Sequence, residues 1–275
     1  MIAFRYSLVL VGILAAINAS AATEKSIVLA STTSVEASGL LANVLPQFTA
    51  KTGITVNVVA QGTGKALDTA RRGDADVLLV HDPEAEREFI DEGYGLTVRQ
   101  VAWNDFIVVG PSSDPARVLG SKDSVAALKA IASARAAFVS RGDRSGTNAA
   151  ELRLWRAAGR TSETLISEEW YHDIGGGMGQ ALNAASATNA YTLTDRATWL
   201  SFNNKGSLII VVEGDARLIN RYDVIELNPG KHRVARLDAA KVFADWLVSP
   251  EGQQAIGAYQ VNGQQLFHPS AASPK

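Results

Sequence analysis

Two clusters of hydroxyl side chains stand where a short apolar run ends and an amphipathic helix is expected to begin. The first, Ser31–Ser34, follows the apolar run Ile27–Ala30, and the second, Ser140–Thr147, follows Ala137–Val139. The N-terminus of a helix carries backbone N–H groups without intrahelical partners and a partial positive charge, so it attracts anions. Short hydroxyls add donors without filling the space that an anion needs. Two such helix ends facing each other would bind a small oxyanion.

The second cluster contains the residue types best suited to an oxyanion. Arg141 offers a planar guanidinium that binds an oxyanion through two parallel hydrogen bonds, unless Asp143 or another carboxylate holds it. Ser145 and Thr147 supply hydroxyls, and Gly146 lets the backbone approach a ligand closely. We expect this loop to contact the anion, and the alternative is an ordinary capped loop.

The first cluster has more hydroxyls than a helix cap requires. One Ser or Thr is enough to cap a helix, yet Ser31, Thr32, Thr33 and Ser34 stand in a row. We therefore expect this cluster to contribute donors to the same anion.

Gly62-Thr63-Gly64-Lys65 follows the expected strand that ends at Ala60 and opens a third helix. The segment lacks the last glycine of a dinucleotide fingerprint, because Leu67 stands there, and it lacks the Ser or Thr that follows Gly-Lys in a P-loop. A nucleotide site is therefore not expected. A tight turn and a third set of donors toward the anion both remain open.

Two further segments have weaker signals. Gly175–Gly179 precedes an expected helix and fits either a ligand-approaching loop or plain flexibility. Tyr191–Arg196 contains a helix cap that we place at Thr194.

Metal binding is considered at one place and set aside. His81, Asp82, Glu84, Glu86 and Glu88 lie close together in the sequence. Their order fits the solvated start of a helix better than a ligand set, so we expect no metal cation site and no cofactor.

Catalytic motifs are missing from the sequence. Gly142–Gly146 has the wrong spacing for a nucleophile elbow, and no His-Glu-x-x-His is present. We expect a binding protein that is not an enzyme. An exported hydrolase that uses Ser145 is the alternative from a different class.

Composition narrows the class further. The 275 residues include no cysteine, which excludes a disulfide framework, a cysteine nucleophile and cysteine-based metal sites. The formal net charge is −2, with no basic tract, so nucleic-acid binding is not expected. An anion site in such a chain depends on local dipoles and not on the overall field.

The first 21 residues predict a secretory signal peptide. Arg5 is the positive n-region, Leu8–Ile17 the apolar h-region, and Ala19-Ser20-Ala21 the cleavage site. The apolar run is too short to span a membrane. We expect a mature chain from Ala22, exported to the periplasm and not membrane-spanning.

Strands and helices alternate along the mature chain, which predicts an α/β fold of one large domain or two lobes. Expected strands are Ser26–Ala30, Ile54–Ala60, Val77–Val80, Phe106–Val109, Ala137–Val139, Leu208–Val212 and Val224–Leu227. Expected helices are Ala37–Ala50, Lys65–Arg72, Glu84–Asp91, Val125–Ser133, Ala149–Ala157, Gln180–Ala187, Asp195–Phe202, Ala239–Leu247 and Glu251–Tyr259. Gly110–Asp123 and Glu213–Tyr222 are candidates for crossings between lobes or for surface loops.

Motifs spread over the whole mature chain carry a resemblance to a known family. They are Thr32-Thr33-Ser34 with Ser38–Leu41, Gly62-Thr63-Gly64, His81–Glu84, Asn104–Phe106 with Gly110-Pro111 and Asp114-Pro115, Ser140–Asp143 with Ser145-Gly146-Thr147, Tyr191–Arg196, Asn228–His232 and Asp245-Trp246-Leu247. Taken together, they resemble those of the periplasmic substrate-binding component of tungstate-specific ABC transporters. That family usually has three threonines before the serine, and Ser31 replaces the first of them here.

The resemblance implies a two-lobed, type II periplasmic-binding-protein fold with the ligand in the interlobe cleft. Lobe I would comprise residues 22–104 and 225–275, and lobe II residues 105–224. The residues that match the family's binding motifs are Thr32, Thr33, Ser34, Thr63, Arg141, Ser145, Gly146 and Thr147. The implied partners are tungstate and a membrane permease of the ABC class, and the protein would be a monomer.

The chemistry of tungstate agrees with this donor set. Tungstate is a tetrahedral dianion without a proton near neutral pH, so it needs donors and no carboxylate acceptor. Monohydrogen phosphate would need an acceptor for its proton, and such mismatches give large discrimination. Phosphate-binding proteins of the same architecture carry a similar Arg-Asp-Gly-Ser-Gly-Thr loop, so the direction of Asp143 matters. Molybdate and phosphate remain alternative ligands.

Overall fold

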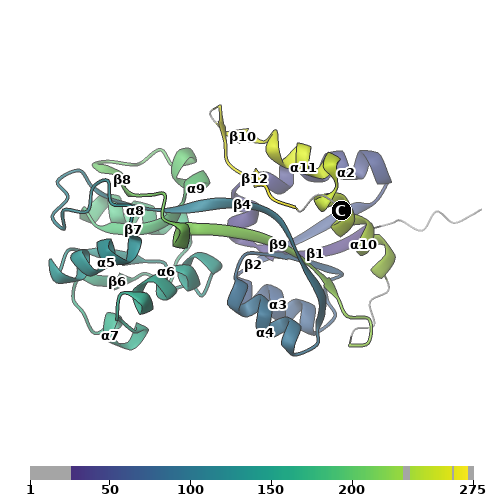
Figure 1. Ribbon diagram of the computed structural model, residues 1–275, viewed down its shortest axis with the longest axis horizontal. Coiled ribbons are helices and arrows are strands. Elements are labelled where there is room, and N and C mark those ends of the chain that lie inside the picture. Colours follow the sequence, from purple (N-terminus) through teal and green to yellow (C-terminus); the bar gives the residue numbers. More distant parts are fainter. Residues whose placement is uncertain (1–25, 232–235, 262, 272–275) are drawn as a thin grey trace, which may run out of the picture.

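Two long antiparallel strands run through the middle of the molecule and connect its two lobes (Figure 1). These strands are β4 (Gly95–Pro111) and β9 (Ile219–Leu227), and they pair from Gly95↔Leu227 to Asp105↔Ile219. The computed structural model describes residues 26–231, 236–261 and 263–271. The expected signal peptide and His232 lie outside these residues.

Lobe I contains the first elements of the chain and its last ones. They are β1 (Ser26–Thr32), α1 (Thr33–Ala37), α2 (Leu40–Thr52), β2 (Thr55–Gln61), α3 (Thr63–Arg71), β3 (Val77–Val80), α4 (Pro83–Asp91), α10 (Leu237–Val248), α11 (Pro250–Gly257), β10 (Gln260–Val261), β11 (Gln264–Gln265) and β12 (His268–Pro269). The strand order is β2-β1-β3-β9-β4, and β12 pairs with β4. β1 is parallel to both β2 and β3.

Lobe II contains the elements between the two crossings. They are α5 (Ser124–Ser133), β5 (Phe138–Ser140), α6 (Gly146–Ala157), α7 (Ser162–Ile166), β6 (Tyr171–Asp173), α8 (Met178–Thr188), β7 (Tyr191–Asp195), α9 (Arg196–Ser201), β8 (Leu208–Val212) and the 3₁₀ helix η1 (Ala216–Leu218). The strand order continues as β4-β7-β5-β6, and β8 also pairs with β4. Figure 1 shows helices on both sides of each sheet.

Each lobe buries its own apolar core. In lobe I, Phe48 packs edge-on against Phe243 with the ring centroids 5.0 Å apart. In lobe II, Phe138 packs edge-on against Trp155 at 5.1 Å. Every residue of β3 is buried, as expected for a strand that helices cover on both faces.

Along each crossing strand, the buried residues pass from the apolar core of one lobe to that of the other. On β4, Ala102 belongs to the main lobe I cluster and Phe106 to a lobe II cluster. On the way back, Leu218 packs in lobe II and Tyr222 in lobe I. The helix starts of one lobe are therefore positioned against the other lobe by these two strands.

The predicted helix Ala37–Ala50 corresponds to α2, but its predicted start is wrong, because a separate short helix precedes α2. α1 ends at Ala37, and Gly39 adopts φ +78° before α2 begins. A Cβ at Gly39 would lie 2.3 Å from the hydroxyl oxygen of Tyr259, which donates to the Ser38 carbonyl at 2.7 Å. Both the backbone angle and the contact require glycine at this break.

Of the two alternatives for Gly110–Asp123, the crossing between lobes is wrong and the surface loop fits. The segment lies in lobe II, where Gly120 N donates to the Val211 carbonyl at 2.9 Å. The crossing is β4, of which the predicted strand Phe106–Val109 is only a part. The polar pair Asn104-Asp105 interrupts the apolar pattern and obscured the length of the strand.

Candidate anion-binding site

Three helices begin where the two lobes meet. α1 and α3 follow the parallel neighbours β1 and β2 of lobe I, and α6 follows β5 of lobe II. Arg141 Nη1 donates to Ser34 Oγ at 3.3 Å, from one lobe to the other. A Cβ added to Gly62 would lie 3.7 Å from the Arg144 carbonyl oxygen. The loop of Arg141 therefore lies against the starts of α1 and α3.

Arg141 is the charged centre of this region. Its side chain is 3% exposed, and Nη2 is paired with Asp143. The buried Nε has no hydrogen-bond partner in the described part of the chain. One edge of the guanidinium thus remains available for an oxyanion.

Both carboxylate oxygens of Asp143 are engaged within its own loop. One of its oxygens accepts from Arg141 Nη2, and the other accepts from Ser145 N at 3.1 Å. The carboxylate therefore fixes the loop and orients the arginine. It does not compete with an anion for the remaining N–H of Arg141.

Two buried hydroxyls, like Arg141 Nε, have no hydrogen-bond partner among the described residues. Thr63 begins α3 in lobe I, and Thr147 is the second residue of α6 in lobe II. Each is 2% exposed, and among the described residues neither Oγ1 has a hydrogen-bond partner. Buried polar atoms normally have partners, so an unpartnered set on two facing helix starts points to a ligand.

The other candidate residues occupy different positions at these helix starts. Thr32 and Ser145 cap α1 and α6, accepting from Val35 N at 3.2 Å and from Asn148 N at 3.3 Å. Ser34 and Gly146 are buried, whereas Thr33 is exposed. Seven of the eight predicted side chains or backbones are thus buried at the lobe junction, and Thr33 is the exception.

Ser31 has a structural role. It is fully buried, and its hydroxyl donates to the Leu79 carbonyl at 2.7 Å. This bond ties β1 to β3 and uses the hydrogen of the hydroxyl. The serine in place of the family's first threonine therefore joins two strands and does not offer its hydrogen to a ligand.

The glycine run Gly175–Gly179 supports Arg141 from its backbone side. Gly176 N donates to the Arg141 carbonyl at 2.8 Å, and Ile174 N donates to the Ser140 carbonyl at 3.2 Å. Gly177 then caps α8. These bonds hold the backbone on which the arginine is mounted.

His81 was not among the site residues predicted from the sequence, where it stood in a family motif and as a rejected metal ligand. It follows β3, and its Nε2 lies 3.0 Å from Thr32 Oγ1 while its Nδ1 lies 3.0 Å from Asn220 Oδ1. A Cβ at Gly146 would lie 2.5 Å from the ring, so only glycine permits this approach. Burial lowers the pKa of His81 to about 4, and the imidazole is therefore neutral at neutral pH.

Asp195 is the cap of α9, and the predicted cap at Thr194 is wrong. Asp195 accepts from Thr198 N at 2.8 Å and from Thr198 Oγ1 at 2.6 Å. Burial raises the pKa of Asp195 above its usual value, while Thr198 and the nearby Arg141 favour its charged form. A carboxylate accepts better than the hydroxyl of the residue before it.

Ion pairs join the lobes beside the site. Arg153 Nη1 on α6 lies 2.8 Å from Asp82 Oδ1, and Asp82 caps α4. A second contact, between Arg156 and Glu84, is longer at 4.0 Å and largely exposed. The first pair links the loop after β3 to α6 and therefore stabilises the approach of the lobes.

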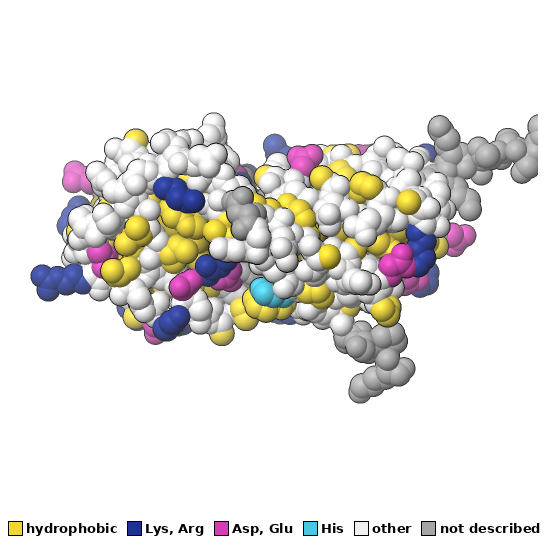
Figure 2. Space-filling model, turned by 90° about the horizontal axis from the view of Figure 1, so that it is seen from above, with side chains coloured by type: hydrophobic (Ala, Val, Ile, Leu, Met, Phe, Trp, Pro, Cys, Tyr) yellow, Lys and Arg dark blue, Asp and Glu magenta, His cyan; other side chains and the backbone are white. Residues whose placement is uncertain are grey.

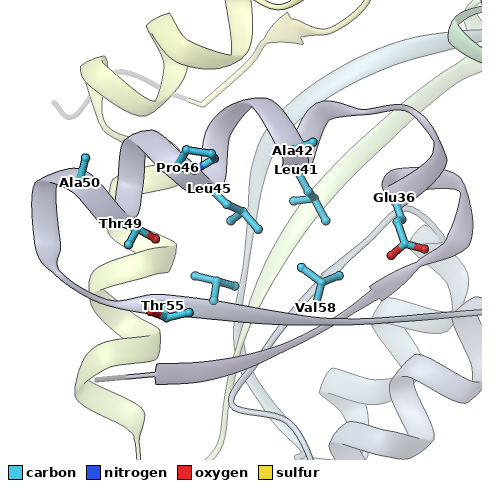
Figure 3. Close-up of a pocket in the computed structure, with 10 residues that line it drawn as sticks. Glu36, Leu41, Ala42, Leu45, Pro46, Thr49, Ala50, Thr55 and Val58 are labelled. Atoms are coloured by element: carbon cyan, nitrogen blue, oxygen red, sulfur yellow. The ribbon is translucent and has the colours of Figure 1, made fainter. Parts of the chain in front are cut away.

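A second concave region has a different character (Figure 3). It is a groove of about 720 Å³ between α2 and β2, lined by Leu41, Leu45, Pro46, Val56, Val58 and neighbouring residues. Apolar side chains from both elements face each other across it, with Glu36 at one end. Such a lining does not suit a dianion.

Other ligand classes find little support in the described residues. Within these residues no group of three or more His, Cys, Asp or Glu side chains could hold a metal ion. On the face seen in Figure 2, Lys and Arg side chains are scattered among acidic and apolar ones and form no continuous basic patch. Of the helices that the structure describes, none is long and apolar enough to cross a membrane.

Comparison with known proteins gives the family. A model of the PBP superfamily domain matches residues 18–251. Tungstate-binding protein TupA of Peptoclostridium acidaminophilum is 46% identical over 251 residues, which are 90% of this chain and 86% of that protein. This chain belongs to the PBP superfamily and, within it, to the TupA family.

Further relatives of this TupA-family chain agree with that placement. Tungstate-binding protein TupA of Campylobacter jejuni is 35% identical over 238 residues, 85% of this chain and 87% of that protein. The solved structure of tungstate-binding protein TupA from Desulfovibrio alaskensis G20 superposes with a TM-score of 0.80 and 41% identity, covering 90% of this chain and 99% of that one. The family resemblance and the two-lobed type II fold expected from the sequence are confirmed.

Proposed function

We propose that this protein captures tungstate in the cleft between its lobes and delivers it to an ABC permease for uptake. The observation that carries the proposal is the set of buried, unpartnered donors on facing helix starts: Thr63 Oγ1 from lobe I, with Arg141 Nε and Thr147 Oγ1 from lobe II. Relatives that carry the name tungstate-binding protein support it. The eight residues Thr32, Thr33, Ser34, Thr63, Arg141, Ser145, Gly146 and Thr147 are the proposed ligand-binding residues.

The charge of the site suits a fully deprotonated anion. Arg141 supplies one positive charge, and the N-termini of α3 and α6 add partial positive charge. Both oxygens of Asp143 are already engaged within its own loop. Because these oxygens already serve Arg141 and Ser145 N, the proton of monohydrogen phosphate is expected to find a poorer acceptor there, and phosphate binding is expected to be weaker.

Binding is proposed to stabilise a closed arrangement of the two lobes. We assign lobe I to residues 22–104 and 225–275 and lobe II to residues 105–224, with the second crossing lying between Leu218 and Tyr222, where the cores change over. An anion that bonds to both lobes favours closure by its differential affinity for the closed state. The permease would then recognise the closed form.

The remaining parts of the proposal follow the transport role. Residues 1–21 are the proposed signal peptide, and the mature chain acts in the periplasm as a monomer. It binds one anion without turnover and is not an enzyme. The Ser145 hydroxyl accepts from Asn148 N, and within the described residues no histidine or carboxylate hydrogen bonds to it, which leaves a serine hydrolase without a base.

Calorimetric titration tests the ligand. Anion-stripped mature protein is titrated with tungstate, molybdate, phosphate and sulfate. Tight one-to-one binding of tungstate with weak phosphate and sulfate binding supports the proposal. If molybdate or phosphate binds more tightly than tungstate, that anion is the ligand in its place. If none of the four anions binds, the anion site is refuted.

A further inference from the structure

Arg144 stands between the two helix starts that carry the unpartnered hydroxyls. It precedes Ser145, the cap of α6, and is followed three residues later by Thr147, so its Cα lies within about 11 Å of that of Thr147. A Cβ added to Gly62, the residue before Thr63, would lie 3.7 Å from the Arg144 carbonyl oxygen. The backbone of Arg144 therefore lies at the lobe junction, beside the proposed site.

The side chain of Arg144 differs from that of Arg141 in both burial and pairing. Arg141 is buried and paired with Asp143, whereas Arg144 is exposed. Among the residues that the structure describes, each arginine except Arg87, Arg117 and Arg144 forms an ion pair. The guanidinium of Arg144 therefore acts on ions in the solvent without a carboxylate to offset it.

The backbone of Arg144 has a conformation that does not favour arginine. Its φ is +58°, in the left-handed region that glycine and asparagine adopt more readily than other residues. Arg144 N donates to Asn148 Oδ1 at 3.3 Å, and Ser145 N donates to Asp143 Oδ1 at 3.1 Å. The turn before α6 imposes this conformation, so local backbone preference does not account for an arginine here.

A dianion approaches this protein against an unfavourable overall charge. The formal net charge of the sequence is −2, and Asp143 offsets Arg141 for an anion that is still outside the junction. Helix N-termini act over about one turn only. An exposed charge acts over the Debye length, which is about 8 Å at 0.15 M salt and about 30 Å at 0.01 M. Attraction from a distance therefore depends on exposed cations beside the site, such as Arg144.

We propose that Arg144 steers oxyanions to the site, so that its charge raises the association rate without contact with the bound anion. This inference rests on the proposed function and deepens it, because it assigns capture to a residue other than those that bind. Arg141 and the buried hydroxyls Thr63 and Thr147 hold the anion, and Arg144 accelerates its arrival. Steering depends on charge alone, so tungstate and molybdate benefit equally and monoanions benefit less.

Coulomb's law gives the expected size of the effect. One unit charge about 10 Å from a dianion in water should change the association rate constant kon about threefold at 0.01 M salt. At 1 M salt the Debye length is about 3 Å, and the effect should vanish. The charge acts on the approaching and the bound anion alike, so the dissociation rate constant koff should not change.

A charge series at position 144 tests the proposal. Arg144→Lys keeps the charge, Arg144→Gln removes it and Arg144→Glu reverses it. Stopped-flow mixing of the anion-stripped mature proteins with tungstate, or with whichever oxyanion calorimetry identifies, gives kon and koff from tryptophan fluorescence. At 0.01 M salt, kon should stay near the wild-type value in Arg144→Lys, fall about threefold in Arg144→Gln and fall about tenfold in Arg144→Glu. The four proteins should agree at 1 M salt.

Arg117 provides a matched control. It is exposed and has a φ of +55°, and it lies in the loop between β4 and α5. That loop follows Pro111, which is about 20 Å along β4 from Asp105 at the lobe junction. Arg117→Glu changes the net charge as much as Arg144→Glu does, so a much smaller decrease in kon is expected from it. Equal decreases would show that net charge, and not the position of Arg144, determines the rate.

Arg144→Asn separates steering from a structural role. Asparagine adopts a positive φ more readily than arginine, so the thermal stability of this variant should be equal to that of the wild type or higher. Its kon at 0.01 M salt should nevertheless fall as in Arg144→Gln. A structural role would instead lower stability or raise koff, and either result at 1 M salt contradicts the proposal.

The failure of this inference can be told from that of the proposed function. If the wild-type protein binds an oxyanion but Arg144→Gln and Arg144→Glu keep its kon at 0.01 M salt, steering by Arg144 is refuted and the site stands. If the wild-type protein binds none of tungstate, molybdate, phosphate and sulfate, the proposed site is refuted and this inference falls with it.

Discussion

The two walls of the proposed site offer different means of binding an anion. The lobe II wall, Ser140–Thr147, carries the charge: Arg141 is buried, oriented by Asp143 and supported from behind by Gly176. The lobe I wall, formed by the starts of α1 and α3, offers buried hydroxyls and helix N-termini. Charge is thus concentrated on one wall, while the other supplies directional donors.

This division separates strength from selection. A guanidinium attracts every oxyanion, whether protonated or not, so lobe II should determine how tightly anions bind. Neutral donors with fixed hydrogens distinguish bare oxygens from protonated ones, so lobe I should determine which anion binds. Variants of the two walls should therefore differ in kind as well as in size.

Loss of the charge should have the largest effect. Arg141→Ala should weaken tungstate binding about 100-fold or more, because truncating one partner of a buried charged contact costs about 2–5 kcal/mol. Arg141→Lys keeps the charge without the planar fork, so its tungstate affinity should lie between that of the wild-type protein and that of Arg141→Ala. Calorimetry with tungstate and phosphate checks both variants. The division is broken if Arg141→Ala leaves either affinity unchanged.

The unpartnered hydroxyls come next. Thr63→Val and Thr147→Val should each weaken tungstate binding about tenfold, because each loses a hydrogen bond to a charged ligand. Thr63→Ser and Thr147→Ser keep the hydroxyl and serve as controls. Thr33 is exposed, so Thr33→Val should have a smaller effect. An equal loss in all three valine variants would show that burial does not mark the ligand-binding hydroxyls.

The ion pair between the walls should have a moderate effect. Arg153→Ala removes the partner of Asp82 at 2.8 Å and should lower tungstate affinity about fivefold, since a partly exposed pair contributes about 1 kcal/mol. Faster release should account for most of it, because the pair holds the lobes together. Stopped-flow dissociation measures this rate. Arg156→Ala, whose contact with Glu84 is 4.0 Å and exposed, should leave the rate unchanged.

Replacing Glu151, the buried carboxyl behind the lobe II wall, should have the smallest effect on tungstate affinity and should instead change stability. Glu151 accepts from Ser140 Oγ at 2.8 Å and from the Tyr171 hydroxyl at 2.7 Å, and burial raises the pKa of Glu151 to about 7. The native state therefore retains a proton that the unfolded state has lost, and the stability from this group, present below pH 4.5, is lost as the pH rises to about 7. The loss amounts to about 3 kcal/mol.

Urea unfolding at pH 4.5, 6 and 8 measures this change. The wild-type free energy of unfolding should decline over the range in which Glu151 ionises. Glu151→Gln cannot ionise and should show a flatter profile. Identical profiles would place the ionisation of Glu151 outside this range.

The candidate site could be predicted from the sequence because its chemistry is local. A hydroxyl cluster between an apolar run and a helix indicates donors at a helix N-terminus wherever the lobes lie. Thr32, Ser145 and Thr147 therefore stand where the pattern placed them. The exposure of Thr33 and the structural bond of Ser31 follow from the orientation of α1 and β1, which the pattern does not contain.

The network behind the site could not be predicted in this way. Thr32, His81, Asn104 and Asn220 are far apart in the sequence and meet only because β4 and β9 cross between the lobes. A single histidine or asparagine has no local signature. The crossing itself was obscured because Asn104, which belongs to this network, interrupts the apolar pattern of β4.

Crystals of the mature protein grown with tungstate provide the most direct test of the account. Tungsten scatters anomalously, so a difference map places the metal without reference to the surrounding side chains. The account predicts one strong peak between the starts of α1, α3 and α6, within hydrogen-bonding reach of Arg141, Thr63 and Thr147 through the tungstate oxygens. A peak in the groove between α2 and β2, or no ordered peak at saturating tungstate, would contradict it.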